Sequence, residues 1–134
     1  PTFTGTPLST TAAEGTDTTQ LATTAFVQNA VKTVVIDTKT ASHSLILTDA
    51  GETIEMNVAT ANNLTIPLNS SVAFPIGTSI NIIQYGAGQT TIVPTGGVTA
   101  RSKDSALNIT GQYSGATLYK RGTDEWVIVG DLTS

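Results

Sequence analysis

Residues 53–58 read Thr-Ile-Glu-Met-Asn-Val, a stretch in which apolar and polar side chains alternate without interruption. Ile54, Met56 and Val58 fall on one face of an extended chain, and the three polar residues fall on the other. A period of two is typical of a β-strand, because successive side chains of a strand point to opposite faces. The stretch therefore predicts a strand with one face in a core.

Similar short runs, rich in β-branched residues, occupy much of the chain after Ile36. They are separated by Gly, Pro, Asn, Asp or Ser, and they cover residues 44–48, 63–66, 79–85, 90–93, 106–110, 116–120 and 125–129. About eight strands result, with no helical pattern between them. We expect a mainly β fold, a small antiparallel β-sandwich or barrel rather than a sheet with helical crossovers. The order of the strands does not follow from the sequence.

The last two runs predict a hairpin, with strands at 118–120 and 125–129 joined by a turn at 121–124. Trp126 is expected to anchor the core. Val127 and Val129 alternate with Trp126 and Ile128, so both faces of this strand are apolar. Such a strand is either covered on both sides within its own domain or in contact with another subunit. We count Val127 and Val129 among the candidate oligomer-interface residues.

The N-terminal part has a different character. Residues 1–16 are almost entirely Pro, Thr, Gly, Ala and Ser, a composition that predicts an extended arm. Asp17 and Gln20 have the spacing of a capping box, so residues 17–36 are expected to form a short amphipathic helix. Its apolar stripe includes Phe26, Val27, Ala30, Val31 and Val34. A short helix needs a partner for its stripe, either the β-sandwich domain expected at residues 37–134 or copies of itself around an axis. We expect residues 17–36 to be an oligomerisation segment, with these five stripe residues as candidate oligomer-interface residues.

Composition excludes several classes of function. Charged residues make up only 12% of the 134 residues, and the net charge of −4 offers no attraction to a phosphate backbone, so nucleic acid is not an expected partner. No apolar run approaches the roughly 18 residues of a membrane-spanning helix, so membrane insertion is not expected. The absence of Cys excludes disulfides and thiolate chemistry.

The residues that could support catalysis are few. His43 is the only histidine, and no nucleophile elbow accompanies it. Three carboxylate pairs could suggest sugar hydrolysis, although turns and the polar face of a strand explain them equally well: Asp49 with Glu52, Glu52 with Glu55, and Asp124 with Glu125. No calcium-binding loop motif is present. We expect no catalytic, cofactor or metal site.

Two tyrosines lie in glycine-rich turns. Tyr85 and Gln89 flank Gly86-Ala87-Gly88, and Tyr113 lies between Gly111 and Gly115. Exposed Tyr rings with nearby amides can stack on sugars or protein surfaces, so Tyr85, Gln89 and Tyr113 are candidate receptor contacts. The alternative is that each ring closes the edge of a core with its hydroxyl in water.

Residues 12–27, Ala-Ala-Glu-Gly-Thr-Asp-Thr-Thr-Gln-Leu-Ala-Thr-Thr-Ala-Phe-Val, resemble a Thr-rich segment found in fibre proteins of tailed bacteriophages. Residues 1–7, Pro-Thr-Phe-Thr-Gly-Thr-Pro, are similar to the repeats that often precede that segment. Segments from 47–51 through 72–78 to 119–122 and 126–132 resemble a β-rich domain that closes many tail fibre proteins.

The resemblance implies a homotrimer around a long axis, located in the phage tail of the virion and assembled in the host cytoplasm. The implied function is structural and non-enzymatic: the β-domain is displayed for attachment to a host cell. The implied partners are further copies of the chain, other phage tail proteins, and a bacterial surface glycan or outer-membrane protein. Two alternatives are a purely architectural cap or connector, and a polysaccharide depolymerase domain.

Overall fold

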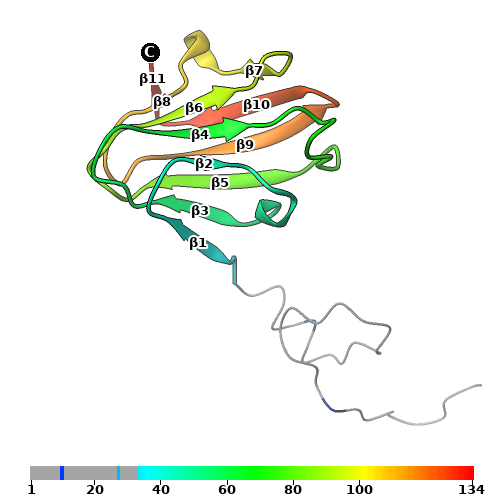
Figure 1. The fold of residues 1–134 in the computed structure, drawn as a ribbon, viewed down its shortest axis with the longest axis horizontal. Helices are drawn as coiled ribbons and strands as arrows, with labels where there is room; N and C mark the ends of the chain where they lie inside the picture. Colours follow the sequence, from blue (N-terminus) through cyan, green and yellow to red (C-terminus); the bar gives the residue numbers. More distant parts are fainter. Residues whose placement is uncertain (1–9, 11–26, 28–32) are drawn as a thin grey trace, which may run out of the picture. The chain divides into compact units, whose positions relative to one another are not determined.

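The computed structural model describes Thr10, Val27 and residues 33–134. Residues 35–134 form one compact unit of eleven strands and two short 3-10 helices (Figure 1). The elements are β1 (Ile36–Lys39), β2 (His43–Ser44), η1 (Leu47–Asp49), β3 (Thr53–Met56), β4 (Asn62–Ile66), β5 (Ser79–Gln84), β6 (Thr90–Pro94), β7 (Thr99–Arg101), η2 (Lys103–Ser105), β8 (Asn108–Ile109), β9 (Gly115–Gly122), β10 (Glu125–Gly130) and β11 (Leu132–Thr133).

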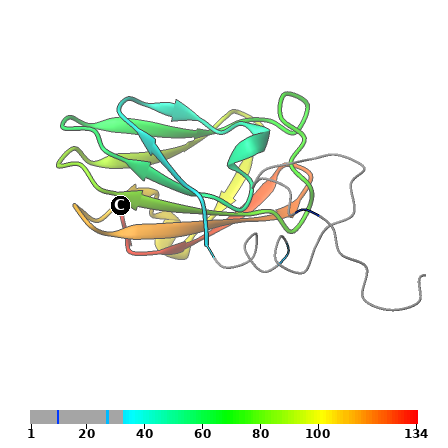
Figure 2. The ribbon, with the colours of Figure 1, turned by 90° about the horizontal axis from the view of Figure 1, so that it is seen from below.

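The strands form two sheets, seen from below in Figure 2. Buried apolar side chains from both sheets pack together in one core. The first sheet has the order β1-β3-β5-β9-β10-β7, and the second has the order β11-β8-β6-β4-β2. The predicted mainly β fold is therefore confirmed. The inward side chains, including Ile54, Met56, Leu64, Ile82 and Leu118, are fully or almost fully buried.

From β1 to β6 the chain alternates between the two sheets, one strand in each. Neighbouring strands from this part are parallel: β1 with β3, β3 with β5, β2 with β4, and β4 with β6. Ile36 aligns with Thr53, and Thr53 aligns with Asn81, so each pass of the chain lies beside the previous one. The first six strands thus form three turns of a flattened coil.

The remaining strands close this coil. In the first sheet β9 runs antiparallel to both β5 and β10, and β7 is parallel to β10. In the second sheet β8 is antiparallel to β6, and β11 is antiparallel to β8. Both sheets are therefore mixed, and the expected antiparallel arrangement is wrong for the first six strands. A strand in the opposite sheet serves as the crossover that a helix usually provides, and alternation along the chain does not distinguish the two arrangements.

Several boundaries also differ from those predicted. β1, β7 and β11 were not predicted, and each lies at an edge of its sheet, where few side chains are buried. The strand expected at 44–48 is shorter than predicted: β2 ends at Ser44, and η1 begins at Leu47. Ile36 was expected to end the helix, but it begins β1, and residues 33–35 are not helical. An apolar Val-Val-Ile run fits either pattern, which explains the error.

The C-terminal hairpin is confirmed, since β9 and β10 pair along most of their length. Trp126 is buried and meets Phe74 edge to face, with ring centroids 5.5 Å apart. Beside it lies the buried ammonium of Lys120, whose Nζ donates to Asn69 Oδ1 at 2.6 Å and to the Phe74 carbonyl at 2.8 Å. Burial lowers the pKa of Lys120. These bonds attach the loop between β4 and β5 to the first sheet.

Successive turns of the coil contact each other backbone to backbone at one corner. The amide of Gly86 donates to the Met56 carbonyl and that of Gly88 to the Val58 carbonyl, both at 2.9 Å. A Cβ on Gly86 would lie 2.3 Å from Val58 O, and one on Gly88 would lie 1.9 Å from Thr60 O. Only glycine therefore fits between these turns.

Buried polar side chains complete the same corner. The Asn62 amide donates to the carbonyls of Thr60 (3.0 Å) and Gly88 (3.3 Å), and Thr90 Oγ1 donates to Asn62 Oδ1 at 2.9 Å. Gln84 Oε1 accepts from the Thr90 amide at 2.9 Å. Because a buried polar backbone group without a partner is costly, these side chains stabilise the passage of the chain from one sheet to the other.

We predict that Gly86→Ala lowers the free energy of unfolding by at least about 3 kcal/mol, because the new methyl group overlaps the backbone of Val58. Gly96→Ala is the matched control, since a Cβ there meets nothing within 4 Å. Urea unfolding of both variants measures the difference. Equal midpoints for the two variants would contradict the stacked corner.

Candidate functional site

The structure brings together two of the three predicted receptor contacts. Tyr85 follows β5, Tyr113 lies in the loop before β9, and their rings meet edge to face with centroids 5.7 Å apart. The rings remain accessible, since Tyr85 is 46% exposed and Tyr113 is 71% exposed. The two residues are 28 positions apart in the sequence and form a single aromatic surface, which we call the tyrosine pair.

Two hydrogen bonds, one between backbone groups and one from a side chain, hold this pair on the sheet. The Tyr113 amide donates to the Gln84 carbonyl at 2.7 Å, and Gln112 Nε2 donates to the Tyr85 carbonyl at 3.0 Å. Both bonds connect the 111–114 loop to the end of β5. The tyrosine pair is therefore held at the end of strand β5.

Tyr113 has a φ of +67°, a left-handed conformation that is unfavourable for a residue with a Cβ. Such strain costs on the order of 1–3 kcal/mol and is common at binding sites. Asp104 and Ser105 share this left-handed conformation, so we treat it as support for the candidate site only together with the exposure of the Tyr113 ring.

Asp131 secures the other side of the same loop. Its carboxylate accepts from Thr110 Oγ1 at 2.7 Å and from Ser114 Oγ at 2.9 Å. These two hydrogen bonds lower the pKa of Asp131. The loop that carries Tyr113 is thus held on one side by β5 and on the other by the segment between β10 and β11.

Gln89, the third predicted contact, lies on the other side of its turn. Its backbone carbonyl accepts from the Asn62 amide, and its side-chain Nε2 donates to the Ile109 carbonyl at 3.3 Å. These bonds direct Gln89 toward the second sheet. Within the described part of the chain, Gln112 is the side-chain amide bonded to the tyrosine pair, and sequence reasoning missed it although it directly precedes Tyr113.

The predicted oligomer-interface residues of β10 lie on the outer face of the first sheet. Val129 is 66% exposed and Val127 is half-buried. The strand pairing places Tyr119 beside Val127, and Ile83 is exposed nearby on β5. A groove of about 420 Å³ runs beside Val129 over Gly115 and Gly130. This face combines exposed apolar side chains with a depression.

The helical stripe is only partly described. Val27 and Val34 are both exposed. Phe26, Ala30 and Val31 lie outside the described residues, so their predicted role stays a prediction.

Three of the acidic residues considered for catalysis, Glu55, Asp124 and Glu125, bond to different polar partners. Asp124 Oδ1 accepts from the Asn69 amide at 2.7 Å, and Glu125 binds the guanidinium groups of Arg101 and Arg121. Glu55 accepts from Thr38 Oγ1 at 3.1 Å. Glu55, Asp124 and Glu125 therefore make ordinary contacts with neighbouring polar groups. Asp49 and Glu52 form the pair that these contacts do not explain.

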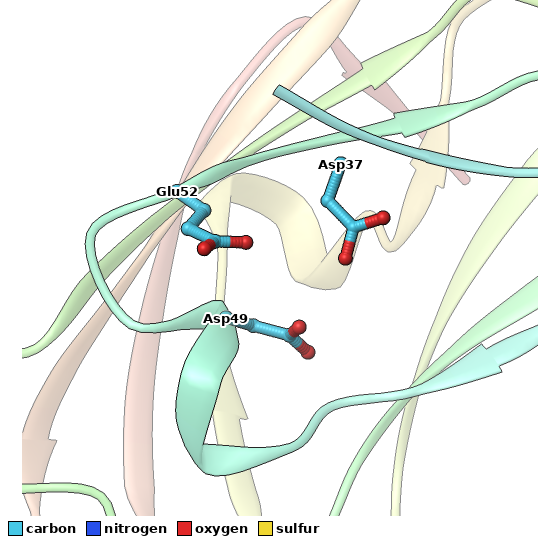
Figure 3. Close-up of side chains that lie close together, drawn as sticks. All are labelled: Asp37, Asp49 and Glu52. Carbon is cyan, nitrogen blue, oxygen red and sulfur yellow. The ribbon is translucent and has the colours of Figure 1, made fainter. Parts of the chain in front are cut away.

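Asp49 and Glu52 lie near each other and near Asp37, with one oxygen of each carboxylate within 4.8 Å of the others (Figure 3). Burial raises the pKa of Glu52, and the neighbouring Asp37 and Asp49 raise it further, while Lys39 lowers it. His43, the only histidine, bonds to Asp49 at 2.8 Å. Sequence reasoning missed Asp37, because it lies on the unpredicted edge strand β1.

No known family model matches the chain, and no curated protein was found to be similar to it. Among the described residues, no helix has the length and apolar character needed to cross a membrane.

We predict that Tyr113→Gly is more stable than Tyr113→Ala by about 1 kcal/mol. Both variants lose the ring contact with Tyr85, but only glycine adopts a φ of +67° without strain. Thermal or urea unfolding of the two variants gives the comparison. A more stable alanine variant would show that the left-handed conformation is absent.

Proposed function

We propose that this chain is a non-enzymatic structural component of a bacteriophage tail fibre, a trimeric β-domain displayed for attachment to a host cell. Its place is the tail of the virion, where it joins further copies of itself and other phage tail proteins. The proposal rests on the resemblance of residues 12–27 and of the β-rich region to fibre proteins. The accessible tyrosine pair is the observation in the structure that supports a contact role.

A rigid support favours binding through this pair. Two of the residues that hold the pair, Gln84 and Asp131, belong to or adjoin strands of the first sheet, so little order must be gained on binding. Tyrosine has few rotatable bonds and offers both an apolar ring and a hydroxyl group. The proposed mechanism is multivalent: three copies bind one cell surface, so weak single contacts add to a strong attachment.

The favoured ligand is a bacterial surface glycan, ahead of an outer-membrane protein. Sugar rings present apolar C–H faces and many hydroxyl groups, which suit aromatic rings beside an amide such as that of Gln112. The chain has few charges, so its surface matches a hydrated neutral polymer.

Two features of the carboxylates favour a role without catalysis. A glycosidase requires an acid with a raised pKa beside a second accessible carboxylate. Glu125 has a lowered pKa, because Arg101 and Arg121 donate hydrogen bonds to it. Glu52 has a raised pKa, but Asp49, its partner in the predicted pair, is 0% exposed, so a polysaccharide could not reach both carboxylates.

We expect Tyr113→Ala to reduce adhesion of the protein to a susceptible bacterial strain, or to its isolated surface polysaccharide, by about tenfold or more. The test screens a panel of strains and polysaccharides with the labelled parent, then compares variants. Ile76→Ala is the control, since Ile76 is 66% exposed and belongs to neither the tyrosine pair nor the candidate oligomer interface. A stable trimer that binds none of the panel would favour the architectural alternative, and release of oligosaccharides would favour the depolymerase.

We expect the parent to have three times the chain mass of 13.8 kDa in light scattering, and Val129→Lys to weaken this trimer. A lysine at Val129 would place three charges at the proposed interface, whereas its effect on a single chain should stay within about 0.5 kcal/mol. Ile76→Lys is a matched control, because Ile76 and Val129 are both 66% exposed. A parent with the mass of a single chain in light scattering would refute the trimer.

A further inference from the structure

The first turn of the coil carries a group of acidic side chains that the proposed attachment function does not use. Asp37 comes from β1, Asp49 ends η1, and Glu52 lies in the turn before β3. Figure 3 shows the three carboxylates pointing toward a common space. Their nearest oxygens lie within 4.8 Å of one another.

Proximity of acids alone does not define a site, but Asp49 adds a second observation. Asp49 is fully buried, and its Oδ2 accepts from the Ile46 amide and bonds to His43 Nε2, both at 2.8 Å. Its Oδ1 is buried without any hydrogen-bond partner among the described residues. A buried carboxylate oxygen without a partner is strongly unfavourable, so this oxygen needs a partner such as a bound ion or a water molecule.

The charges of the group point to a cation. With His43 neutral, the three carboxylates and the Lys39 ammonium sum to −2. Lys39 Nζ contacts Asp37 Oδ2 at 2.6 Å, and no bond from it to Asp49 is seen in the described part of the chain. A divalent cation would cancel the remaining charge and supply the partner that Asp49 Oδ1 lacks.

We propose that Asp37, Asp49 and Glu52 form a Ca²⁺ site. Ca²⁺ takes oxygen ligands at about 2.3–2.6 Å, so two oxygens on one ion lie up to about 5.2 Å apart. Three equidistant oxygens at about 2.6 Å from one ion lie about 4.5 Å apart, so oxygens within 4.8 Å of one another need at most a small side-chain movement to bind one Ca²⁺ ion together. The same arrangement around Mg²⁺ requires a separation of about 3.6 Å and near-octahedral geometry, so Mg²⁺ fits less well. Water would complete the coordination.

The ion would join three segments of the first coil turn. Among the described strands, β1 has one neighbour, β3, and it is attached there by short pairing from Ile36 to Lys39. Asp37 lies in this edge strand, whereas Asp49 and Glu52 precede β3. Bound Ca²⁺ would therefore hold the edge strand against the rest of the domain and stabilise the folded state.

The test is calorimetric titration of the full chain with CaCl2 to about 5 mM, a range that covers the affinities of weak extracellular sites. Thermal unfolding in chelator, CaCl2 and MgCl2 provides a second readout. We expect one Ca²⁺ per chain and a melting temperature that rises with Ca²⁺ more than with Mg²⁺.

Glu52→Gln and Asp37→Asn should each weaken Ca²⁺ binding by about tenfold or more. In chelator, Glu52→Gln should be at least as stable as the parent, because it removes repulsion among the carboxylates, yet it should gain little from Ca²⁺. Glu55→Gln is the control, since it removes the same charge from β3 outside the group and should bind Ca²⁺ as the parent does.

Three results would overturn the proposal. The first is a parent that shows neither heat of binding nor a Ca²⁺-dependent melting temperature at about 5 mM. The second is a Glu55→Gln variant that loses binding as much as Glu52→Gln does. The third is an equal response to Mg²⁺ and Ca²⁺, which would indicate general screening of charge.

Discussion

The domain depends on the close contact of successive coil turns at one corner, where backbone meets backbone. A side chain at Gly86 or Gly88 would overlap the backbone of Val58 or Thr60. The amides of the two glycines donate to the carbonyls of Met56 and Val58. Asn62 and Thr90 satisfy the polar groups that this contact buries. The corner joins β3 to β4 in one turn of the coil and β5 to β6 in the next. The contact between the two turns therefore sets the register of β3 with β5 in the first sheet and of β4 with β6 in the second.

This constraint also positions the candidate contact surface. Tyr85 directly precedes Gly86, so the ring projects from the corner where β5 leaves the first sheet. The loop before β9 then docks on β5 through the bond between Tyr113 and Gln84. A coil with side chains packed between its two sheets is a rigid support for this surface. Rigidity suits a protein that is proposed to present weak contacts in several copies.

The two ends of the coil differ in how they are closed. After β6 every strand pairs antiparallel except β7, which is parallel to β10, and the β9–β10 hairpin covers the side of β5 that a fourth turn would occupy. At the other end β1 and β2 are edge strands, which are vulnerable to fraying and to pairing with other chains. The proposed Ca²⁺ site belongs to this end and would strengthen it, while the exposed outer face near Val129 is available for the proposed contact between subunits.

Residue patterns predict the mainly β class and part of the core: alternation in residues 53–58 predicts a strand, and Trp126 in a hairpin predicts a buried anchor. The same patterns mark Tyr85 and Tyr113 as candidates, because both lie in glycine-rich turns. Three features become visible only in the folded domain: the parallel pairing among the first six strands, the contact between the two rings, and the grouping of Asp37 with Asp49 and Glu52. Alternation records which face of a strand is buried, whereas pairing partners depend on where the crossover passes, and no local pattern encodes that path.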